Sequence, residues 1–560
     1  MQEKSDTPSV KGKNYADFSR DELIAEINRL KKTKKYGLVW EHKKEEVIEN
    51  FKAGQQPYLK EVEDKRIENA PGEPTNLIIE GDNFDALSVL NYTHAGKIDV
   101  IYIDPPYNTG NKDFIYNDNY VDSEDAFRHS KWLSFMEPRL KLAKNLLAED
   151  GVIFISIDEH EQSALKLLCD KVFGDENFVD CVVWDKKSSA KGVPPRNMLV
   201  NVHEYIVTYQ KSSKFSFLGE KRDEGSFKNP DNDPRGPWRN TNIKSTIKSK
   251  DKAFTIVDPK TGNEYTDTWA YSKAELDRLI EDGVLLFPKN KNGQVRRKEY
   301  LLEMKNQNMA IKSSFGLFDG QKNTEMLKSM LPGILFLNPK PIALMEYLLG
   351  IASDKNATIL DFFAGSGTTG HAVLELNKED GGHRQFILCT NNGDKGPDST
   401  KIAEEITYPR IKTVITGKRQ DGSKYSDGIP ANLRYYKIKH EQKLGSNDAN
   451  RQNMSKHIED ILQIKENAFE EVKTGRAYKL YKNSEKYLCL ALDAFEMEKI
   501  IEKIAEENRE KLDTIIYSFS YSRDAFEDDY ETDFNIEFKA MPEGLLKTYL
   551  NITESLRSED

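Results

Sequence analysis

The chain has 560 residues, of which 38% are hydrophobic and 10% aromatic, so it can form two or three domains with a substantial buried core. It contains no run of about 18 apolar residues, and its first ten residues are polar. We therefore expect no membrane partner, no secretory signal and a cytoplasmic location. The four cysteines are scattered without CxxC spacing, which is typical of free structural thiols.

The net charge of −11 argues weakly against nucleic acid as a partner, but the charge is unevenly distributed. Residues 181–312 hold 25 Lys and Arg against 17 Asp and Glu, a balance of +8. Residues 441–560 hold 17 Lys and Arg against 27 Asp and Glu, a balance of −10. Because a phosphate backbone responds to the local field, we expect different partners for the basic middle and the acidic end.

The beginning of the chain is predicted to be helical and charged. Ser19 and Glu22 fit a capping box, and four apolar residues follow at helical spacing, namely Leu23, Ile24, Ile27 and Leu30. The basic run at residues 31–35 could contact phosphates, although a solvated helix end is the simpler interpretation.

From residue 76 the pattern changes to short apolar strands that alternate with amphipathic helices. Strands are predicted at residues 77–80, 98–103, 151–157, 181–184, 204–210, 358–361 and 385–389. Helices are predicted at residues 82–90, 132–147, 163–173, 341–350 and 370–377. Residues 211–308 break this rhythm, being rich in Lys, Asn, Gly and Asp. The alternation predicts a Rossmann-like, doubly wound α/β domain with an open parallel sheet, interrupted by an insertion.

These patterns divide the chain into five predicted parts. They are an N-terminal helical region (1–75), the first part of the α/β core (76–210), an insertion (211–330), the second part of the core (331–440) and a small C-terminal α+β domain (441–560). In the last part an apolar helical stripe runs from Met497 to Ala505, and residues 513–519 are expected to pair with an alternating strand around residues 534–538.

The segment Asp361–Gly370 (DFFAGSGTTG) follows a predicted strand and opens a predicted helix. Glycines let the backbone turn sharply and approach a ligand, and a helix N-terminus directs amide groups toward an anion. Gly365, Gly367 and Gly370 formally match the GxGxxG dinucleotide fingerprint, which alone is a weak signal. NAD would also require an acid after the next strand, which ends instead in residues 389–392 (CTNN). These glycines alone leave NAD open.

The tetrapeptide Asp104-Pro105-Pro106-Tyr107 follows the predicted strand at 98–103, where such sheets bind ligands. It suits a planar amine such as N6 of adenine, which is a poor nucleophile because its lone pair is delocalised into the ring. The Asp104 carboxylate and the Pro105 carbonyl offer acceptors for its two N–H bonds, and consecutive prolines hold that carbonyl rigidly. Tyr107 offers an aromatic face for a base swung out of the duplex. The structural alternative is a Pro-Pro turn capped by Asp104.

Together the two motifs resemble those of amino-methylating DNA methyltransferases. Their order, with the catalytic motif first and a long insertion between them, resembles the β class of N6-adenine enzymes. Three longer segments resemble the modification subunits of type III restriction-modification systems, namely residues 104–120 (DPPYNTGNKDFIYNDNY), 231–238 (DNDPRGPW) and 406–411 (ITYPRI). The resemblance covers most of residues 76–438.

This resemblance implies S-adenosylmethionine as cofactor, double-stranded DNA as substrate, an insertion that recognises the target sequence, and a homodimer with a restriction subunit as partner. It assigns cofactor-binding roles to Asp82, Lys340, Asp361, Phe363, Gly365, Gly367 and Thr368. Asp82 would contact the cofactor adenine, although an N-cap role explains it equally well. Lys340 would line the cofactor pocket. The ribose contact stays open between the amides of Asn391 and Asn392.

Basic and aromatic residues in the middle of the chain are the candidate DNA contacts. They are Arg196, Arg235, Trp238, Arg239, Lys244, Lys248, Arg296 and Arg297. Some should touch phosphates and a few should recognise bases, since Arg is the usual partner of guanine edges. For any one of them, a phosphate contact or a solvated charge is the simpler interpretation. The acidic C-terminal domain is expected to dock a second copy or a restriction subunit, with a buttress for the core as the alternative.

Other functions fit parts of the same pattern. A solitary methyltransferase or an N4-cytosine enzyme would share both motifs, although cytosine enzymes more often begin the tetrapeptide with Ser. Protein-glutamine methyltransferases usually begin it with Asn and place the Gly motif first. A catalytically idle DNA-binding subunit is the alternative of another class, against which the intact motifs argue. Metal-ligand spacing is absent from His129, His160, His203 and His371, so no metal is expected. The sequence has no Gly-Lys-Ser/Thr phosphate loop, so no ATPase activity is expected.

Overall fold

The structure is a computed structural model, and it describes residues 19–20, 23, 38–110, 113–117, 119–188, 198–220, 224–290, 292–304, 308–334, 336, 338–393, 401–519, 530 and 532–558. The chain forms two compact units. Unit 1 comprises Met1–Ser216, Ser313–Leu349 and Ser353–Asp560, and unit 2 comprises Phe217–Lys312 with Gly350–Ala352. The predicted N-terminal helix around residues 19–30 lies almost wholly outside the described residues.

Unit 1 is built on strands and helices that alternate along the chain. Up to the insertion they are α2 (Glu46–Lys52), β1 (Gln55–Glu61), β2 (Thr75–Glu80), α3 (Asn83–Thr93), β3 (Ile98–Ile103), β4 (Ile115–Tyr116), β5 (Asn119–Tyr120), α4 (Arg128–Leu146), β6 (Leu147–Ile157), α5 (Gln162–Phe173), β7 (Phe178–Asp185) and β8 (His203–Gln210). After it come β14 (Ser314–Leu317), α8 (Gly320–Met330), α9 (Ile342–Ala352), β15 (Thr358–Asp361), α10 (Thr368–Asp380), β16 (Gln385–Thr390), a π-helix (Ile402–Thr407), α11 (Tyr408–Thr416) and β17 (Asn432–Gln442).

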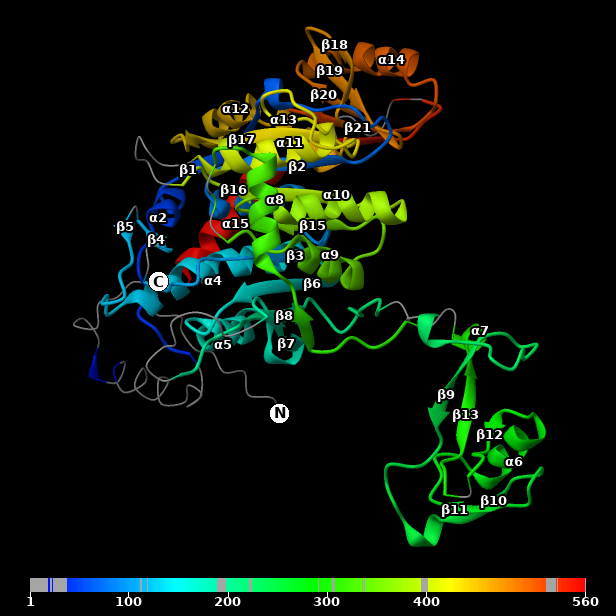
Figure 1. The fold of residues 1–560 in the computed structure, drawn as a ribbon. Coiled ribbons are helices and arrows are strands. Elements are labelled where there is room, and N and C mark those ends of the chain that lie inside the picture. The colour runs from blue at the N-terminus through cyan, green and yellow to red at the C-terminus, as the bar shows by residue number, and fades with distance from the viewer. Residues whose placement is uncertain are drawn as a thin grey trace, which may run out of the picture. The chain divides into compact units, whose positions relative to one another are not determined.

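One ten-stranded sheet runs through unit 1 in the order β1-β17-β2-β16-β15-β3-β6-β8-β7-β14 (Figure 1). The six strands from β17 to β6 are parallel to one another. At the two ends the sheet is mixed, because β1 is antiparallel to β17, and β8 is antiparallel to both β6 and β7. The predicted Rossmann-like α/β fold is confirmed, whereas the expectation of a purely parallel sheet holds only for its centre.

Helices cover both faces of this sheet, which explains the near-continuous apolar runs of its central strands. In β3 every residue except Asp99 is buried. Alternate strand residues such as Ile101 and Ile103 share one core with α3, α4 and α5. A second group of helices is formed by α10, which contacts α11, and α11, which contacts α8. Among the described residues, no helix is both long and apolar enough to cross a membrane.

The C-terminal part contains a second sheet, in the order β18-β19-β20-β21-β22. Its elements are α12 (Asn447–Ser455), α13 (Glu459–Glu466), β18 (Glu470–Thr474), β19 (Tyr478–Lys482), β20 (Lys486–Ala491), α14 (Met497–Glu507), β21 (Asp513–Ser518), β22 (Ile536–Ala540) and α15 (Glu543–Arg557). The predicted pairing is present as parallel strands β21 and β22. Of the predicted apolar stripe on α14, Met497, Ile500, Ile501 and Ile504 are buried, whereas Ala505 is exposed.

This part is not a compact unit of its own, which differs from the predicted boundary at residue 441. The helix α13 packs against α3 and β1, and α15 packs against α2 and α3. The hydroxyl of Tyr549 donates a hydrogen bond to the Pro57 carbonyl at 2.5 Å. The helices near the end of the described chain therefore complete the core of unit 1.

Unit 2 is the insertion, and it is shorter than the predicted range of 211–330. Its elements are β9 (Trp238–Asn242), β10 (Phe254–Val257), β11 (Glu264–Asp267), α6 (Lys273–Glu281), β12 (Leu285–Leu286), β13 (Arg296–Tyr300) and α7 (Leu301–Met304). A small core contains Ile243, Ile256, Tyr265, Trp269, Leu276, Leu285 and Val295. Residues 314–330 form β14 and α8 and belong to unit 1, where β14 pairs with β7. A four-residue strand carries too little alternation to be predicted from sequence.

Candidate active site

The two predicted motifs meet at the carboxyl edge of the central sheet. Asp104 follows β3 and Asp361 ends β15, and the two strands are parallel neighbours with Ile101 opposite Leu360. From β15 the chain continues to β16 on one side, and from β3 it continues to β6 on the other. The two loops therefore flank the point where the strand order reverses, which is where open α/β sheets bind ligands.

The tetrapeptide is held from beneath by the neighbouring helix and loop. The indole nitrogen of Trp132, on α4, donates to the Pro106 carbonyl at 2.7 Å. The next residue, Asn108, adopts a left-handed φ of 57°, and its amide donates to Glu161 at 2.6 Å. Glu161 is fully buried and also contacts His129 Nδ1 at 2.6 Å. This support was not predicted, because it joins three segments that carry no shared sequence pattern.

A charged cluster surrounds the tetrapeptide. Lys340 Nζ lies 3.0 Å from Asp104 Oδ1 and 3.3 Å from Glu204 Oε2, and it donates to the Tyr107 hydroxyl at 2.7 Å. Tyr107 in turn donates to Glu204 Oε2 at 3.1 Å. Lys186 lies 3.2 Å from the other oxygen of Glu204. The side chains of Lys340 and Glu204 are only 13% and 11% exposed, so water screens these contacts weakly.

The environment sets the charge of each group in this cluster. Burial raises the pKa of Asp104, and Lys340 opposes that rise. Burial would also raise the pKa of Glu204, but Lys340 and Lys186 outweigh it and hold that pKa below its ordinary value. Burial and the nearby carboxylates raise the pKa of Tyr107 far above its ordinary value, so its hydroxyl stays protonated and can donate. For Lys340, the two carboxylates outweigh burial and raise its pKa, so it remains a cation.

Glu204 was not predicted as a site residue, and Lys340 was predicted only as part of the cofactor pocket. Glu204 reaches the site because β8 is antiparallel to β6, with Tyr205 opposite Ile157, so the start of β8 lies beside the ends of the parallel strands. Lys340 directly precedes Pro341, the N-cap of α9. The structure thus brings Lys340 to the tetrapeptide. The one sequence signal for Glu204 is an acid at the start of an apolar strand.

The Gly turn adopts the sharp conformation that its sequence predicted. Gly365 and Gly367 have φ of 47° and 77°, in the left-handed region that favours glycine. Gly370 serves another purpose, because a Cβ there would lie 2.9 Å from Leu388 and hold α10 away from β16. The Thr407 hydroxyl donates to the Gly365 carbonyl at 2.6 Å. The fully buried Arg410 donates to the hydroxyls of Ser366 and Thr368, both at 2.9 Å.

These last contacts come from the ITYPRI segment, which therefore buttresses the turn from behind. Burial lowers the pKa of Arg410 to about 9. Asp361, at the start of the turn, accepts from the Thr369 hydroxyl at 2.6 Å and from the Phe363 amide at 3.0 Å. Burial raises the pKa of Asp361 to about 7, against these two hydrogen bonds. The turn is therefore a polar loop that these hydrogen bonds hold at the start of α10.

Asp82 has the first of the two roles that the sequence left open, and its exposure is compatible with the second. It is the N-cap of α3, where it accepts from the Phe84 amide at 2.7 Å. Its side chain is 36% exposed, so it can also meet a ligand at the end of β2. Arg139 fixes it from below at 3.2 Å, and the same guanidinium binds both oxygens of Glu45 at 2.7 and 2.8 Å.

The two asparagines after β16 are partly engaged in turns. The Asn391 side-chain oxygen accepts from the Gly393 amide at 3.1 Å. Asn392 donates to Glu80 at 2.7 Å, and its oxygen accepts from the Glu404 amide at 3.2 Å. Glu80, at the end of β2, is therefore an acidic group in contact with Asn392, and it was not predicted.

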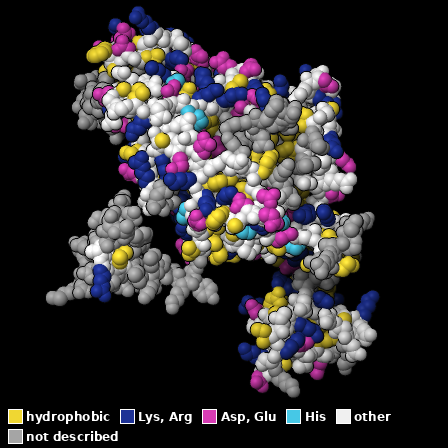
Figure 2. Space-filling view, turned by 90° about the vertical axis from the view of Figure 1, so that its left-hand side faces the viewer, with side chains coloured by type: hydrophobic (Ala, Val, Ile, Leu, Met, Phe, Trp, Pro, Cys, Tyr) yellow, Lys and Arg dark blue, Asp and Glu magenta, His cyan; other side chains and the backbone are white. Residues whose placement is uncertain are grey.

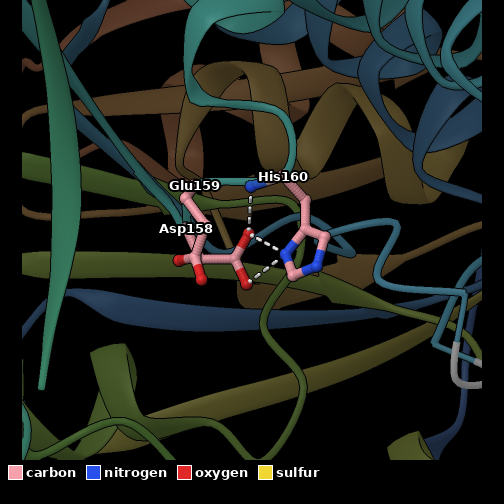
Figure 3. A group of neighbouring side chains, drawn as sticks. All are labelled: Asp158, Glu159 and His160. Carbon is pink, nitrogen blue, oxygen red and sulfur yellow. Dashed lines mark hydrogen bonds and ion pairs between the residues drawn. The ribbon is translucent and has the colours of Figure 1, made fainter. Parts of the chain in front are cut away.

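A single group of side chains with metal-ligating chemistry occurs among the described residues, namely Asp158, Glu159 and His160 after β6 (Figure 3). Asp158 accepts from the backbone amide of His160 at 2.9 Å, and both its oxygens lie 3.0 Å from His160 Nδ1. These contacts form an ordinary turn closed by its own side chains. A cavity of about 360 Å³ lies elsewhere, at the amino ends of β2, β16 and β17, and its lining includes Asn76, Asn377, His383 and Arg384.

Most side chains of the insertion that were predicted to contact DNA instead form hydrogen bonds or ion pairs within unit 2. Arg235 binds Asp233 through two hydrogen bonds of 3.0 Å, and Trp238 donates to Asp231 at 2.8 Å. Other ion pairs join Arg239 to Glu299 at 2.5 Å, Lys244 and Lys248 to Asp267 at 2.6 Å, and Arg297 to Glu303 at 3.6 Å. Arg196 lies outside the described residues.

The DNDPRGPW segment therefore forms a structural network. The buried Asp233 also accepts from Lys298 and from the Tyr300 hydroxyl, both at 2.7 Å. These hydrogen bonds, together with Arg235, hold the pKa of Asp233 well below its ordinary value. Arg296 differs, since its described contact is a hydrogen bond of 3.0 Å to the neutral Gln294. On the face drawn in Figure 2, Lys and Arg side chains are interspersed with Asp and Glu.

The chain belongs to the DNA methylase family (N6_N4_Mtase), whose family model matches residues 98–394. It is similar to the Mod subunit of the type III restriction-modification enzyme StyLTI from Salmonella typhimurium, with 35% identity over 60% of this chain and 55% of the relative. It is similar to the EcoPI Mod subunit from Escherichia phage P1, with 33% identity over 63% of this chain and 62% of the relative. The chain thus spans little more than half the length of these relatives.

A further relative is the type II methyltransferase M.KpnI from Klebsiella pneumoniae, with 32% identity over 65% of this chain and 90% of the relative. The matched family region contains both the tetrapeptide and the Gly turn. Membership of the family therefore rests on the same segments that form the candidate active site.

Proposed function

We propose that this protein is a site-specific DNA methyltransferase that transfers a methyl group from S-adenosylmethionine to N6 of adenine. One observation carries the proposal: the Asp104–Tyr107 tetrapeptide and the Gly365–Gly367 turn lie on the adjacent parallel strands β3 and β15. An acceptor pair for an amine and a cradle for a cofactor therefore share one edge of the sheet. The similarity to DNA adenine methyltransferase YhdJ from Escherichia coli, with 25% identity over 27% of this chain, supports adenine as the target base.

The residues at this edge fit the proposed cofactor. Gly365 and Gly367 form the turn, α10 begins behind it, and the half-buried ring of Phe363 lies beside it. Asp82 offers a partly exposed carboxylate for the nucleoside end. S-adenosylmethionine, when bound, supplies an electrophilic methyl group on a sulfonium. Binding it between these loops would bring the methyl group near the tetrapeptide.

The tetrapeptide residues would hold and activate the amine. The Asp104 carboxylate and the Pro105 carbonyl accept its two N–H bonds, which favours a more pyramidal and more nucleophilic nitrogen. Pro106 is fixed by Trp132, which stabilises the loop that bears this carbonyl. Tyr107 offers a ring against which the flipped base stacks, while its hydroxyl is held by Lys340 and Glu204.

The best-supported role is that of the modification subunit of a type III system, which acts on double-stranded DNA in the cytoplasm. The similarity to three Mod subunits supports this role. A solitary enzyme is the second candidate, because M.KpnI is matched over 90% of its length. Replacing residues 217–312 with the corresponding segment of a relative tests the role of the insertion. The methylated sequence should change, and an unchanged sequence would place recognition elsewhere.

A homodimer and a restriction subunit are the proposed protein partners, with the C-terminal part as the docking surface. Leu492 and Phe495, which are 51% and 102% exposed, support a docking role there. The packing of α13 and α15 supports the alternative that this part buttresses the core. The double variant Leu492→Asp and Phe495→Asp should lose pull-down of the restriction subunit or dimerisation by light scattering. Leu550→Asp, on the half-exposed face of α15, is the matched control.

Purified protein, labelled cofactor and a DNA library test the proposed activity, and single-molecule sequencing of DNA from expressing cells identifies the base and its context. The expected product is N6-methyladenine in one short sequence. N4-methylcytosine would instead assign the chain to the other chemistry that the family name covers. The absence of any methyl incorporation by a folded protein would favour an idle DNA-binding subunit.

A further inference from the structure

We propose that Lys340 is a positioning residue of the methyl-transfer site, which holds the Asp104 carboxylate so that it is aimed at the target amine. This inference rests on the proposed function and deepens it. It assigns Lys340 to the catalytic tetrapeptide rather than to the cofactor pocket. It also assigns Glu204 as the group that holds Lys340 in place.

The geometry around Lys340 is that of a built site. Its ammonium contacts three oxygens at once, at 3.0 Å from Asp104 Oδ1, 3.3 Å from Glu204 Oε2 and 2.7 Å from the Tyr107 hydroxyl. It also lies 4.9 Å from the centre of the Tyr107 ring. The contact with Tyr107 is a hydrogen bond, and those with Asp104 and Glu204 are ion pairs. Four side chains from three separate segments are therefore locked into one arrangement.

The position of Lys340 needs these carboxylates. It directly precedes the N-cap of the eleven-residue helix α9, where the helix dipole disfavours a cation. Its side chain is only 13% exposed, so the charge is largely removed from water. A buried cation persists when it is paired and hydrogen-bonded, which Asp104 and Glu204 provide. No described contact of Lys340 leads toward the Gly turn, which is the part of the site that would hold the cofactor.

Lys340 gives the two oxygens of Asp104 different roles. It takes Oδ1, which leaves Oδ2 to accept an N–H bond of the target amine beside the Pro105 carbonyl. A carboxylate fixed at one oxygen cannot rotate freely, so the second oxygen is pre-aimed. The ion pair also favours the charged form of Asp104, in which both oxygens are acceptors and neither carries a proton.

The balance at Asp104 includes every charged or titratable group that faces it. Lys340 from the segment before α9 favours ionisation, and Glu204 from β8 opposes it. The nearby Tyr107 hydroxyl also favours the ionised form. Tyr102 on β3 and Asp361 on β15 also interact with this carboxylate, and Asp361 adds a further negative charge when ionised. Lys186 acts indirectly, through Glu204.

Removing either partner should move the acid limb of the pH–rate profile, and in opposite directions. The rate of methyl transfer is expected to rise with pH as Asp104 ionises. Lys340→Met removes the favouring charge, so the midpoint should move upward by about one to three pH units. Glu204→Gln removes the opposing charge, so the midpoint should move downward. Lys340→Arg keeps the charge, so its midpoint should return toward that of the wild type even if its rate is lower.

The experiment is a single-turnover measurement of methyl transfer to a target duplex between about pH 5 and 9, with titration calorimetry of S-adenosylmethionine in parallel. Lys186→Met is the matched control, because Lys186 contacts Glu204 and not Asp104, and it should move the midpoint less than Lys340→Met. Cofactor affinity should be unchanged in Lys340→Met. Loss of that affinity would assign Lys340 to the cofactor pocket and overturn the inference.

The two proposals fail in different ways. If the wild-type protein transfers no methyl group to adenine, the proposed function fails. If the wild type is active but Lys340→Met and Glu204→Gln lower the rate without moving the midpoint, or move it in the same direction, the positioning role of Lys340 is wrong. Circular dichroism establishes whether Lys340→Met folds. If it does not fold, the direction in which Glu204→Gln moves the midpoint of the pH–rate profile decides.

Discussion

Lys340 Nζ lies 3.0 Å from Asp104 Oδ1, although the two residues stand on opposite sides of the insertion in the sequence. The first part of the split domain thus supplies the tetrapeptide, and the second part supplies the cation that holds it. The Gly turn also comes from the second part, on β15. Both parts must therefore fold together before the site exists.

Replacing the Asp104 carboxylate should remove most of the activity. Asp104→Asn keeps the shape of the side chain but replaces a charged acceptor aimed at the reacting amine. A loss of about 10²–10³ in the single-turnover rate is expected for such a group. The measurement is methyl transfer to a target duplex, with circular dichroism to establish folding. Wild-type rates in a folded Asp104→Asn or Asp104→Ala variant would refute the assignment of this residue.

The ring and the hydroxyl of Tyr107 should contribute unequally to the rate of methyl transfer. Tyr107→Phe keeps the ring but removes the hydroxyl that links Lys340 to Glu204, so we expect a loss of about 2–10-fold, the effect of one modest hydrogen bond. Tyr107→Ala also removes the stacking face, and the rate should fall by about a further 5–150-fold. Both variants are compared by single-turnover kinetics. Equal losses in the two variants would mean that the ring does not support the base.

Cofactor binding should depend on the conformation of the Gly turn. Gly367 has φ of 77°, and a Cβ there would lie 3.2 Å from Thr407. Gly367→Val should therefore abolish binding of S-adenosylmethionine in calorimetry. Gly381→Val is the matched control, because Gly381 has a similar φ of 66° but open space around it at the end of the same helix. If both variants bind normally, or both fail equally, the turn has no special part in the pocket.

The buried Asp361 should make the protein less stable as the pH rises. Its pKa is raised from the ordinary value of 3.8 to about 7, so the folded state binds a proton that the unfolded state releases. That contribution to stability is complete below about pH 4 and is lost as the pH rises through 7. Asp361→Asn cannot ionise, so its melting temperature should fall less than that of the wild type between about pH 4 and 7. Parallel melting curves would show that Asp361 does not ionise in this range.

Arg235 and Arg296 should affect different properties. Arg235 is held by Asp233 inside the network of unit 2, so Arg235→Ala should lower the melting temperature of the protein. Arg296 is bonded to the neutral Gln294, so Arg296→Ala should leave stability unchanged but weaken DNA binding. If Arg296 contacts a phosphate, the slope of log affinity against log salt should fall by about one. Thermal unfolding and salt-dependent binding assays separate the two residues, and the reverse pattern would contradict this assignment.

The sequence carried strong signals for the centre of the sheet and for both motif loops. The near-continuous apolar runs of β3 and β6 predict strands covered on both faces, and a loop at the end of such a strand is a site for ligands. The start of α10 was also predicted from the sequence, because the glycines before it permit a left-handed turn. Each of these signals lies within one short segment, so it can be recognised without knowing which other segments that segment contacts.

The remaining parts of the site depend on contacts between distant segments. Glu204 lies at the active edge only because β8 runs antiparallel, and nothing in a short apolar strand fixes its direction. Arg139, Glu45 and Asp82 come from three segments, and each looks like an ordinary surface charge when taken alone. The DNDPRGPW segment shows the opposite effect, since its charge and aromatic content suggested DNA contacts but its side chains mainly satisfy one another.

The most direct test of the central claim is transfer of a radiolabelled methyl group from S-adenosylmethionine to DNA, followed by digestion and chromatography of the nucleosides. The wild-type protein is predicted to place the label on N6-methyladenine, and Asp104→Ala is predicted to lose at least about 99% of that signal. Label in another nucleoside, or full labelling by Asp104→Ala, would contradict the claim that the tetrapeptide after β3 methylates adenine.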